Sequence, residues 1–508
     1  MEKRLILAIA LSLLVLLSWS ALAPKTYHIE NKEVIKEAPA VTSSPQIFRP
    51  EKTLSSEIPP TSLLKWSNDK YEIAFIEPYA AIKEVEFKTF FSSKLNLEQG
   101  FYIADPSLIF TKESLSSQEL TFVCNSTDKK IVKHFYYDNS NYSIELEIKI
   151  QNLSNAVLKL DVPLVLGVLN FSGDQNEVRF QDVTVATEEK VIHLNARKES
   201  VFNAIKFLGL RNRYFCAIIE PLEKNIYTAF IKTDTPRQTI IGLKSKAFIL
   251  SPGQQIEQKF RIYLGPQDLK VITSIKPDWS VVMHYGTFGF ISQLLLQLLE
   301  ILHRLVRNWG FAIVILSIMI YFLLYPLTLK QMRAMKEMQS LQPRIEELRK
   351  IYKDNPQKLN KEIMELYRVH KVNPLGGCLP LVLQIPIFFA LYQALMRSVA
   401  LKGARFLWIK DLSRPDSLFI LPVSLPMLGN EINLLPILMS IGMFVQQKLS
   451  MKTTSSASSE QQKLMLIIFP LMFGFIFYRM PSGLVLYWLV NSLLMLTYQF
   501  QISRPKQP

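Results

Sequence analysis

Residues that usually build catalytic and metal centres are scarce in this 508-residue chain. It holds three cysteines and six histidines, and none of them lies at zinc-ligand spacing. A Walker A loop, a nucleophile elbow and a glycine-rich dinucleotide turn are missing as well. The sequence therefore suggests no enzyme activity, no metal site and no cofactor.

Acidic residues are scarce in the second half of the chain, where most of the net charge of +15 collects. Residues 24–284 hold 32 Lys and Arg against 31 Asp and Glu, whereas residues 285–508 hold 24 against 11. A nucleic-acid-binding surface would place the excess on a soluble domain, and residues 24–284 are nearly neutral. The excess therefore indicates cytoplasmic loops between membrane helices, not a nucleic-acid partner.

The N-terminus is an apolar run from Leu5 to Ala23 that follows Lys3 and Arg4. Its last residues look like a signal cleavage site, but its length favours a retained membrane anchor over residues 1–23. With either interpretation, the next domain is exported. Residues 24–62, rich in Pro, Ser, Thr and Lys, are expected to form a disordered linker.

Residues 63–284 show the periodicity of strands. Tyr142 to Ile150 alternates almost strictly between apolar and polar residues, which predicts a strand with one buried face. Further short candidates are 87–91, 157–162, 178–185, 227–232 and 257–264. Such strands, separated by turn signals, predict an antiparallel β-sandwich, so the whole chain is expected to be an α+β multidomain membrane protein.

Cys124 and Cys216 both fall in this exported domain. An oxidising compartment permits a disulfide between them. Sequence spacing says nothing about their distance, so two separately buried thiols are at least an equal alternative.

Residues 285–307 are expected to form an amphipathic helix. Gln293, Gln297, Glu300 and Arg304 recur at spacings of four, three and four on an apolar background. One polar stripe is typical of a helix lying in the bilayer surface. A helix packed on the exported domain is the alternative.

Five apolar spans follow within residues 308–502, at about 309–329, 378–396, 434–450, 464–478 and 484–500. With the anchor they make six transmembrane helices, which puts both termini on one side. Basic residues place that side, including the tail 503–508, in the cytoplasm. The span 464–478 reaches only ~22 Å, against a hydrocarbon core of ~30 Å, so we expect a locally thinned bilayer.

The connection between the first two of these spans, residues 330–373, is basic and dotted with methionine. Apolar residues recur at threes and fours from Met332 to Ile351, Pro356 interrupts, and the pattern resumes from Leu359 to Val369. This predicts a cytoplasmic helical hairpin with a packed seam. Its methionine-rich surface also suits promiscuous binding.

The spans contain uncharged polar side chains. Ser317, Tyr321 and Tyr325 share one face of the first span. The others are Gln384, Gln393, Gln446, Tyr487, Trp488 and Asn491. Singly, each suits hydrogen bonding between helices; together they favour a wettable, chargeless cavity. No Asp or Glu lies within a span, which argues against a proton-coupled pump.

Several motifs together resemble the YidC/Oxa family of membrane protein insertases. They are Asn308-Trp309-Gly310-Phe311, Tyr325-Pro326-Leu327-Thr328, Val372 to Pro380 (VNPLGGCLP), Gln384 to Phe388 (QIPIF) and Pro481 to Trp488 (PSGLVLYW). The resemblance covers about residues 285–502. The anchor and the large exported domain are similar to the Gram-negative form, in which that domain is a periplasmic β-supersandwich.

The resemblance implies a multi-pass protein of the inner membrane that inserts and folds membrane proteins, alone or with the Sec translocon. A hydrophilic groove, open to the cytoplasm and to lipid but closed on the outside, would take up polar parts of a nascent chain without using a nucleotide. The implied partners are nascent membrane proteins, the Sec translocon, the ribosome with the signal recognition particle pathway, and the bilayer. The expected groove residues are Ser317, Tyr321, Gln384, Gln446, Tyr487, Trp488 and Asn491.

One position departs from the family pattern. The family usually carries an arginine four residues before the tyrosine of the Tyr-Pro-Leu-Thr motif, and this chain has Tyr321. A tyrosine can donate and accept hydrogen bonds but cannot attract an acidic tail by charge. Electrostatic capture inside the groove is therefore not expected here.

Two other classes of function are set against this one. A small-solute transporter would show inverted repeats and midplane charges, and neither is seen. An exported carbohydrate-active enzyme would need converging carboxylates in residues 63–277, which a sequence alone cannot locate.

Overall fold

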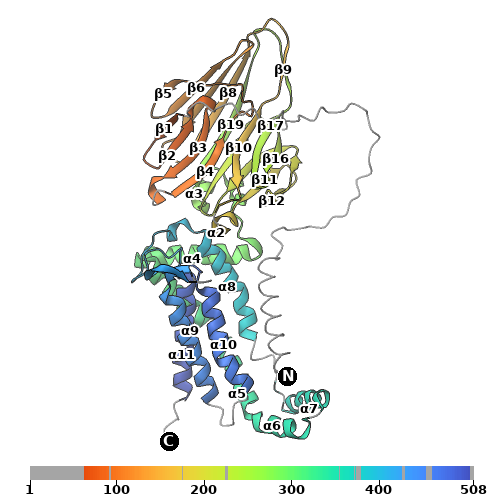
Figure 1. Cartoon of the computed structure of the whole chain (residues 1–508), viewed down its shortest axis with the longest axis vertical. Helices are drawn as coiled ribbons and strands as arrows, with labels where there is room; N and C mark the ends of the chain where they lie inside the picture. Colours follow the sequence, from red (N-terminus) through yellow and green to blue (C-terminus); the bar gives the residue numbers. More distant parts are fainter. Residues whose placement is uncertain are drawn as a thin grey trace, which may run out of the picture. The chain divides into compact units, whose positions relative to one another are not determined.

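The computed structural model describes residues 62–503 except 91–92, 174, 224–226, 354, 371, 373–378, 426–428 and 453–459. The expected anchor 1–23, the linker before Ser62, residues 504–508 of the tail and Cys378 lie outside these residues. The chain divides into two compact units, Met1–Val282 and Met283–Pro508. Figure 1 shows strands in the first and mainly helices in the second.

The first unit contains three main sheets, all antiparallel. Sheet A has the order β1 (Leu63–Ser67), β2 (Tyr71–Ile76), β3 (Ala81–Phe87), β4 (Ser93–Gly100). Sheet B has the order β10 (Pro163–Asn170), β17 (Gln238–Ser245), β16 (Tyr227–Thr235), β13 (Ser200–Phe202). Sheet C has nine strands in the order β12 (Val191–Leu194), β11 (Asp182–Thr187), β14 (Ile205–Arg211), β15 (Phe215–Pro221), β19 (Gln255–Pro266), β8 (Ser143–Asn152), β7 (Lys129–Tyr137), β6 (Glu119–Asn125), β5 (Thr111–Leu115).

Sheets A and B together face sheet C. The segment after β4 joins β10, because the Phe101 amide donates to the Val165 carbonyl at 2.6 Å. Aromatic rings meet across the interior: Phe87 of β3 stacks on Phe215 of β15, with centroids 4.1 Å apart. On the sheet B side, Tyr227 contacts Phe260 of β19 at 5.4 Å. The predicted antiparallel sandwich is therefore confirmed.

The strand predictions succeed where apolar and polar residues alternate or where an apolar run is bounded by turns. The predicted strands 142–150, 227–232 and 257–264 correspond to β8, β16 and β19. In β8, Ile144, Leu146, Ile148 and Ile150 are buried, which is the expected inward face. The prediction at 157–162 is correct only for β9 (Leu158–Leu160), which pairs with β18 (Phe248–Leu250).

Two predicted strands are wrong in part. The segment 87–91 leaves the sheet after Phe87, because the pairing with β2 ends at Tyr71 and Lys88–Phe90 form a 3₁₀ turn. The segment 178–185 begins in the short helix α2 (Gln175–Val178), and the strand β11 starts only at Asp182. Apolar content alone does not indicate where hydrogen bonding to a neighbouring strand begins or ends.

Cys124 and Cys216 are free, buried thiols. They lie on β6 and β15, which three strands of sheet C separate, so about four strand spacings of ~4.8 Å keep them ~19 Å apart. A disulfide needs Cα atoms within ~7 Å, so separate burial is the alternative that holds. Burial raises the pKa of the Cys216 thiol to about 12.

Lys133 on β7 is fully buried. Its ammonium group donates to the carbonyl oxygens of Ala80 (2.6 Å) and Phe101 (2.5 Å). These two residues have φ angles of 47° and 59°, so each marks a tight reversal of the chain beside sheet A. Burial lowers the pKa of Lys133 to about 7. One side chain of sheet C thus fixes two turns of the opposite layer.

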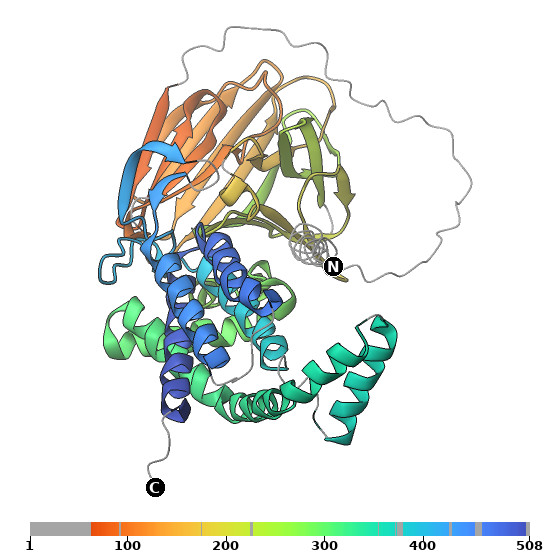
Figure 2. The same cartoon turned by 60° about the horizontal axis from the view of Figure 1, so that its bottom comes forward.

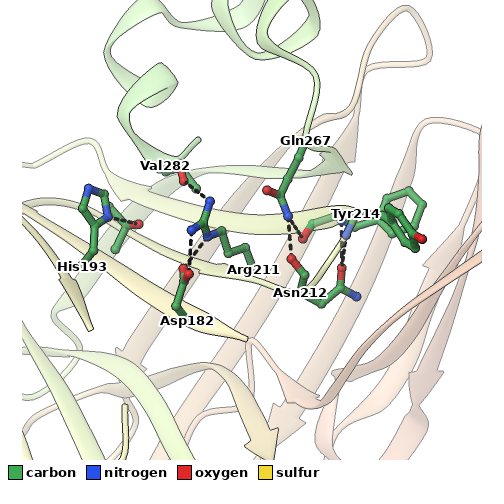
Figure 3. A network of polar contacts seen from close by, with 9 residues as sticks. Asp182, His193, Arg211, Asn212, Tyr214, Gln267 and Val282 are labelled. Atoms are coloured by element: carbon green, nitrogen blue, oxygen red, sulfur yellow. Dashed lines mark hydrogen bonds and ion pairs between the residues drawn. The ribbon is translucent and has the colours of Figure 1, made fainter. Parts of the chain in front are cut away.

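A buried ion pair holds the C-terminal end of this unit. Arg211 on β14 is 1% exposed and contacts both carboxylate oxygens of Asp182 on β11. Its Nη1 also donates to the Val282 carbonyl at 3.1 Å, as Figure 3 shows. In the same 3₁₀ segment (Pro277–Val282), which follows α3 (Leu269–Ile275), the buried Trp279 indole donates to Glu220 at 3.0 Å. The segment that leads to the second unit is therefore fixed on sheet C.

In its described residues, the second unit consists of helices and one small hairpin. Its elements are α4 (Gly289–Val306), α5 (Trp309–Ser340), α6 (Gln342–Ile351), α7 (Pro356–Val369), α8 (Leu379–Arg397), β20 (Phe419–Leu425), β21 (Gly429–Ile432), α9 (Leu434–Lys452), α10 (Glu460–Phe477) and α11 (Ser482–Ser503). Helix α11 packs against α9, α5 and α8, and α10 packs against α9. Leu316, Leu391, Met439 and Leu484 are among the buried residues of this core.

Among the described residues, Gly289–Val306, Trp309–Lys330 and Ser482–Phe500 are long and apolar enough to cross a membrane, and Leu434–Leu449 and Leu466–Phe477 are shorter apolar helices. The helix predicted within residues 285–307 is present as α4, whose buried residues Ser292, Leu295, Leu299 and Leu302 face α5 and α8, while its position at the bilayer surface stays a prediction. Its exposed side mixes Gln297 and Arg304 with Phe290 and Leu305.

The helical hairpin differs from its prediction at its start. Helix α5 runs unbroken to Ser340, so residues 330–340 extend the first span. The hairpin proper is α6 and α7, which Figure 2 shows as two neighbouring teal helices beyond the end of α5. Leu341 and Ile345 are buried against Ile363 and Leu366, which confirms the predicted seam.

Candidate functional site

One hydrogen bond joins two of the predicted groove residues from distant parts of the chain. The Gln384 side-chain amide on α8 donates to the Tyr487 hydroxyl on α11 at 2.6 Å. Tyr487 is fully buried and Gln384 is half-buried. A buried polar pair inside an apolar helix core satisfies itself and leaves further lone pairs and an N–H for water or a polar chain.

Asn491 and Ser317 bond to their own helices. The Asn491 amide donates to the Tyr487 carbonyl at 2.9 Å, one turn earlier on α11. The Ser317 hydroxyl, fully buried on α5, donates to the Ile313 carbonyl at 2.7 Å. Both groups are therefore satisfied locally, which lowers the cost of a polar atom in an apolar surrounding.

Tyr321 is different, because its buried hydroxyl has no hydrogen-bond partner among the described residues. Its ring lies 6.1 Å from that of Tyr325, whose own ring lies 5.5 Å from that of Tyr498 on α11. Tyr321 therefore carries a polar group that the described part of the helix core does not satisfy.

Trp488 belongs to an aromatic cluster. Its ring centroid lies 5.5 Å from Phe388 on α8, and 5.8 Å and 5.3 Å from Phe473 and Phe477 on α10. It therefore forms an apolar wall between α8, α10 and α11, next to the polar Tyr487. Gln446 is half-buried on α9, and within the described part of the chain no hydrogen bond joins it to the other predicted groove residues.

The loop between α8 and α9 ties several helix ends together. Asp416, 3% exposed, accepts hydrogen bonds from the Trp408 indole (3.1 Å) and from the backbone amides of Leu434 (2.8 Å) and Leu435 (3.0 Å). A carboxylate at the first amides of α9 satisfies donors that the helix leaves unpaired and faces the positive end of its dipole.

Further bonds extend this mesh to the other helices. The Asn433 side chain donates to the Tyr478 carbonyl at the end of α10 (2.7 Å). The backbone amides of Ser482 and Gly483, at the start of α11, donate to the carbonyls of Arg414 (2.7 Å) and Leu412 (3.0 Å). Near the start of α5, the Asn308 amide donates to the Arg405 carbonyl at 3.3 Å. These hydrogen bonds therefore join the ends of α5, α9, α10 and α11 to the loop between α8 and α9.

No local sequence pattern indicated which residues make these contacts. Asp416 caps a helix that begins 18 residues later, so no local capping signal reveals it. Gly310 could have been noticed, because the quoted Asn-Trp-Gly-Phe motif contains it. A Cβ added there would lie 2.0 Å from the Phe406 ring of the loop, so only glycine allows this approach. Among the described residues, the structure brings no cluster of potential metal ligands together.

Two protein families match separate parts of this chain. Residues 86–298 match a family described as the YidC periplasmic domain, and residues 301–508 match one described as the 60Kd inner membrane protein. A membrane protein insertase YidC of Pelobacter propionicus is 34% identical over 81% of this chain and 76% of its own length. One from Geotalea daltonii is 28% identical over 99% of both chains. A crystal structure of an active YidC insertase, with its first transmembrane domain resolved, covers 87% of this chain and 94% of that chain at 19% identity and a TM-score of 0.41.

Proposed function

Because this chain belongs to the YidC family of membrane protein insertases, we propose that its insertion of membrane proteins uses a polar groove among α5, α8, α9 and α11. The family is one of insertases rather than of catalytic enzymes, and its members act on nascent membrane proteins at the bilayer. The Gln384–Tyr487 hydrogen bond carries the proposal, since it places two uncharged polar groups inside the helix core. Ser317, Tyr321, Gln446, Trp488 and Asn491 complete the proposed groove.

The groove would be closed at its outer end and open at the other. The mesh around Asp416 and Asn433 supports this polarity, because it seals the bundle end where the loop between α8 and α9 lies. A polar segment of a nascent chain would enter the open end, and water in the groove would shorten the apolar distance that remains to be crossed. The short apolar part of α10, Leu466–Phe477, spans ~18 Å and favours a locally thin bilayer.

The same proposal fixes a topology. The β-rich domain is periplasmic, so α5 would run from the periplasmic side to the cytoplasm, and α8 would return. The loop between α8 and α9 would then be periplasmic, and the α6–α7 hairpin and both termini cytoplasmic. The N-terminal anchor would supply the sixth span. Accessibility of single cysteines to an impermeant reagent in intact cells tests each of these positions.

The partners of the hairpin are part of the proposal. The α6–α7 pair exposes Ile351, Met364 and Val369 beside its basic residues, a surface suited to a nascent chain, a ribosome or the signal recognition particle pathway. Cooperation with the Sec translocon is proposed from the family alone. Crosslinking from Met364→Cys to a stalled nascent chain would test the hairpin's part.

The groove is tested by removing one polar group. Gln384→Leu should reduce insertion of a short two-span substrate, such as the small subunit of the ATP synthase, into proteoliposomes. Gln393→Leu is the matched control, because nine residues turn it to the opposite side of α8. A selective loss in Gln384→Leu supports the groove. Equal insertion by both variants, at equal protein levels, would exclude Gln384 from it.

A further inference from the structure

The loop between α8 and α9 carries an apolar hairpin whose side chains are exposed among the residues that the structure describes. On β20, Phe419, Ile420 and Val423 are 63%, 70% and 67% exposed. Neighbouring strand residues point to opposite faces, so Phe419 and Ile420 leave both faces of this two-stranded ribbon uncovered. Two-stranded ribbons are marginal in water, and this one exposes apolar side chains on each side.

A second apolar tip lies in the same loop. The amide of Phe406 donates to the Ile409 carbonyl (3.0 Å) and the amide of Ile409 donates back (2.8 Å), which leaves Leu407 and Trp408 as a two-residue turn. Leu407 has a φ of 51°, a conformation that favours glycine or asparagine, and it is 74% exposed. Neither the backbone geometry nor contact with water favours leucine at this tip, so an apolar surrounding is the natural explanation.

Basic side chains surround these tips. Arg405 and Lys410 flank the Leu407 turn and are exposed. Arg479, also exposed, reaches the hairpin, because a Cβ on Gly429 of β21 would lie 3.6 Å from its guanidinium. The hairpin's own acidic residue, Glu431, is half-buried and its backbone carbonyl accepts the Tyr478 hydroxyl. Apolar tips with a basic rim match acyl chains below anionic phosphates.

The position of the β20–β21 ribbon, directly before α9, is consistent with contact with lipid. Strand β21 ends at Ile432 and α9 begins at Leu434, so the ribbon is attached to a helix end. Ile437 and Ile441 continue along α9 as exposed apolar residues, 41% and 54% exposed. In Figure 1 the ribbon appears as blue arrows at the end of the helices of the second unit. Exposed apolar residues of the ribbon are therefore followed along the chain by exposed apolar residues of α9, which the proposed topology places against lipid.

We propose that the β20–β21 ribbon and the Leu407 turn insert into the periplasmic leaflet, with Arg405, Lys410 and Arg479 binding headgroup phosphates. This inference rests on the proposed topology, in which the loop between α8 and α9 is periplasmic. The ribbon then holds this end of the helix bundle at a fixed depth in the bilayer. It also displaces lipid of the periplasmic leaflet next to the bundle.

The test measures depth in full-length protein reconstituted in phosphatidylglycerol–phosphatidylethanolamine vesicles. Single spin labels are placed at Ile420→Cys, Leu407→Cys and Ile441→Cys, in a background without native cysteines, and their collision rates with oxygen and with a water-soluble nickel chelate are compared. Exposed Ile249→Cys in the periplasmic domain is the aqueous control. The oxygen-to-nickel ratio at Ile420 and Leu407 should be several-fold above that at Ile249.

The outcomes separate this inference from the topology beneath it. If the label at Ile420 collides mainly with the nickel chelate and the label at Ile441 mainly with oxygen, the ribbon is not inserted, although α9 still spans the bilayer. A nickel-accessible Ile441 overturns the topology itself. Protection of Ile420 from both reagents means that protein covers it, which also overturns the proposal. Replacing Arg405, Lys410 and Arg479 by glutamine should make the ribbon shallower in phosphatidylglycerol vesicles, with the label at Ile441 unchanged; an unchanged ribbon depth refutes the phosphate contacts.

Discussion

Raising the pH from 7 to 9 should stabilise the β-domain through one side chain, Lys133. Its pKa is about 7 in the folded protein, against 10.5 for an ordinary lysine. Between these values the unfolded chain binds a proton that the folded domain has released, so the free energy of unfolding rises with pH. Each pH unit is worth at most ~1.4 kcal/mol, and the gain between pH 7 and 9 is about 2 kcal/mol.

The window ends near pH 9 because other buried groups act in the opposite sense. The Cys216 thiol has its pKa raised from 9.0 to about 12, so the folded state keeps a proton there that the unfolded chain loses above pH 9. Burial lowers the pKa of His193 from 6.5, so this side chain changes its protonation state only below this pH window. Below pH 7 Lys133 is protonated in both states, and its contribution to the pH dependence disappears.

Urea unfolding of residues 62–282 at pH 7, 8 and 9, followed by the fluorescence of buried Trp66 and Trp279, measures the slope. Lys133→Met should abolish the rise, although it removes the donor from two carbonyls at a cost of ~1–3 kcal/mol each. Lys130→Met, on the same strand, should keep the wild-type slope. A flat profile in the unmodified domain, or a rise that survives in Lys133→Met, refutes the reasoning.

Three further changes test other contacts. Asp182→Ala should lower the unfolding free energy of the same domain by ~3–5 kcal/mol, because it leaves the buried Arg211 guanidinium without its carboxylate partner; an unchanged urea midpoint would contradict this. Gly474→Ala should lower the thermal unfolding temperature of the full protein in detergent, since its Cβ would lie 2.2 Å from the Ser440 hydroxyl, and adding Ser440→Ala should restore it; failure to recover would point elsewhere. Tyr321→Phe should impair insertion of a short two-span substrate more than Phe322→Leu on the exposed side of α5, because it would remove a polar group from the proposed groove; equal insertion by both variants would contradict this.

Local periodicity predicted the elements that bury one face and expose the other. The alternation from Tyr142 to Ile150 located β8, and the spacing of Leu341, Ile345, Ile363 and Leu366 located the hairpin seam. Both patterns record which face of an element is buried, and burial is what periodicity reports. The segment 87–91 failed because its end is decided by the strand it pairs with, not by its own β-branched and aromatic residues.

Residues of the proposed groove could be suggested from the sequence, but their contacts could not. Gln384 and Tyr487 are 103 residues apart, so nothing in the chain's order indicated that they bond. The capping role of Asp416 could not be predicted for the same reason, because it lies 18 residues before the α9 amide to which it bonds. Tyr321 was singled out as a departure from the family, and the structure adds that its hydroxyl lacks a partner among the described residues.

The mesh around Asp416 and Asn433 has a mechanical consequence. A rigid helix that is held at one end can tilt about that end. Helix α10 has 18 residues and is therefore ~27 Å long. A tilt of ~10° about the Asn433–Tyr478 bond would shift its opposite end by ~5 Å while the pivot hardly moves. The open end of the proposed groove would therefore widen by about the breadth of a side chain while the Asn433–Tyr478 hydrogen bond at the other end stays intact.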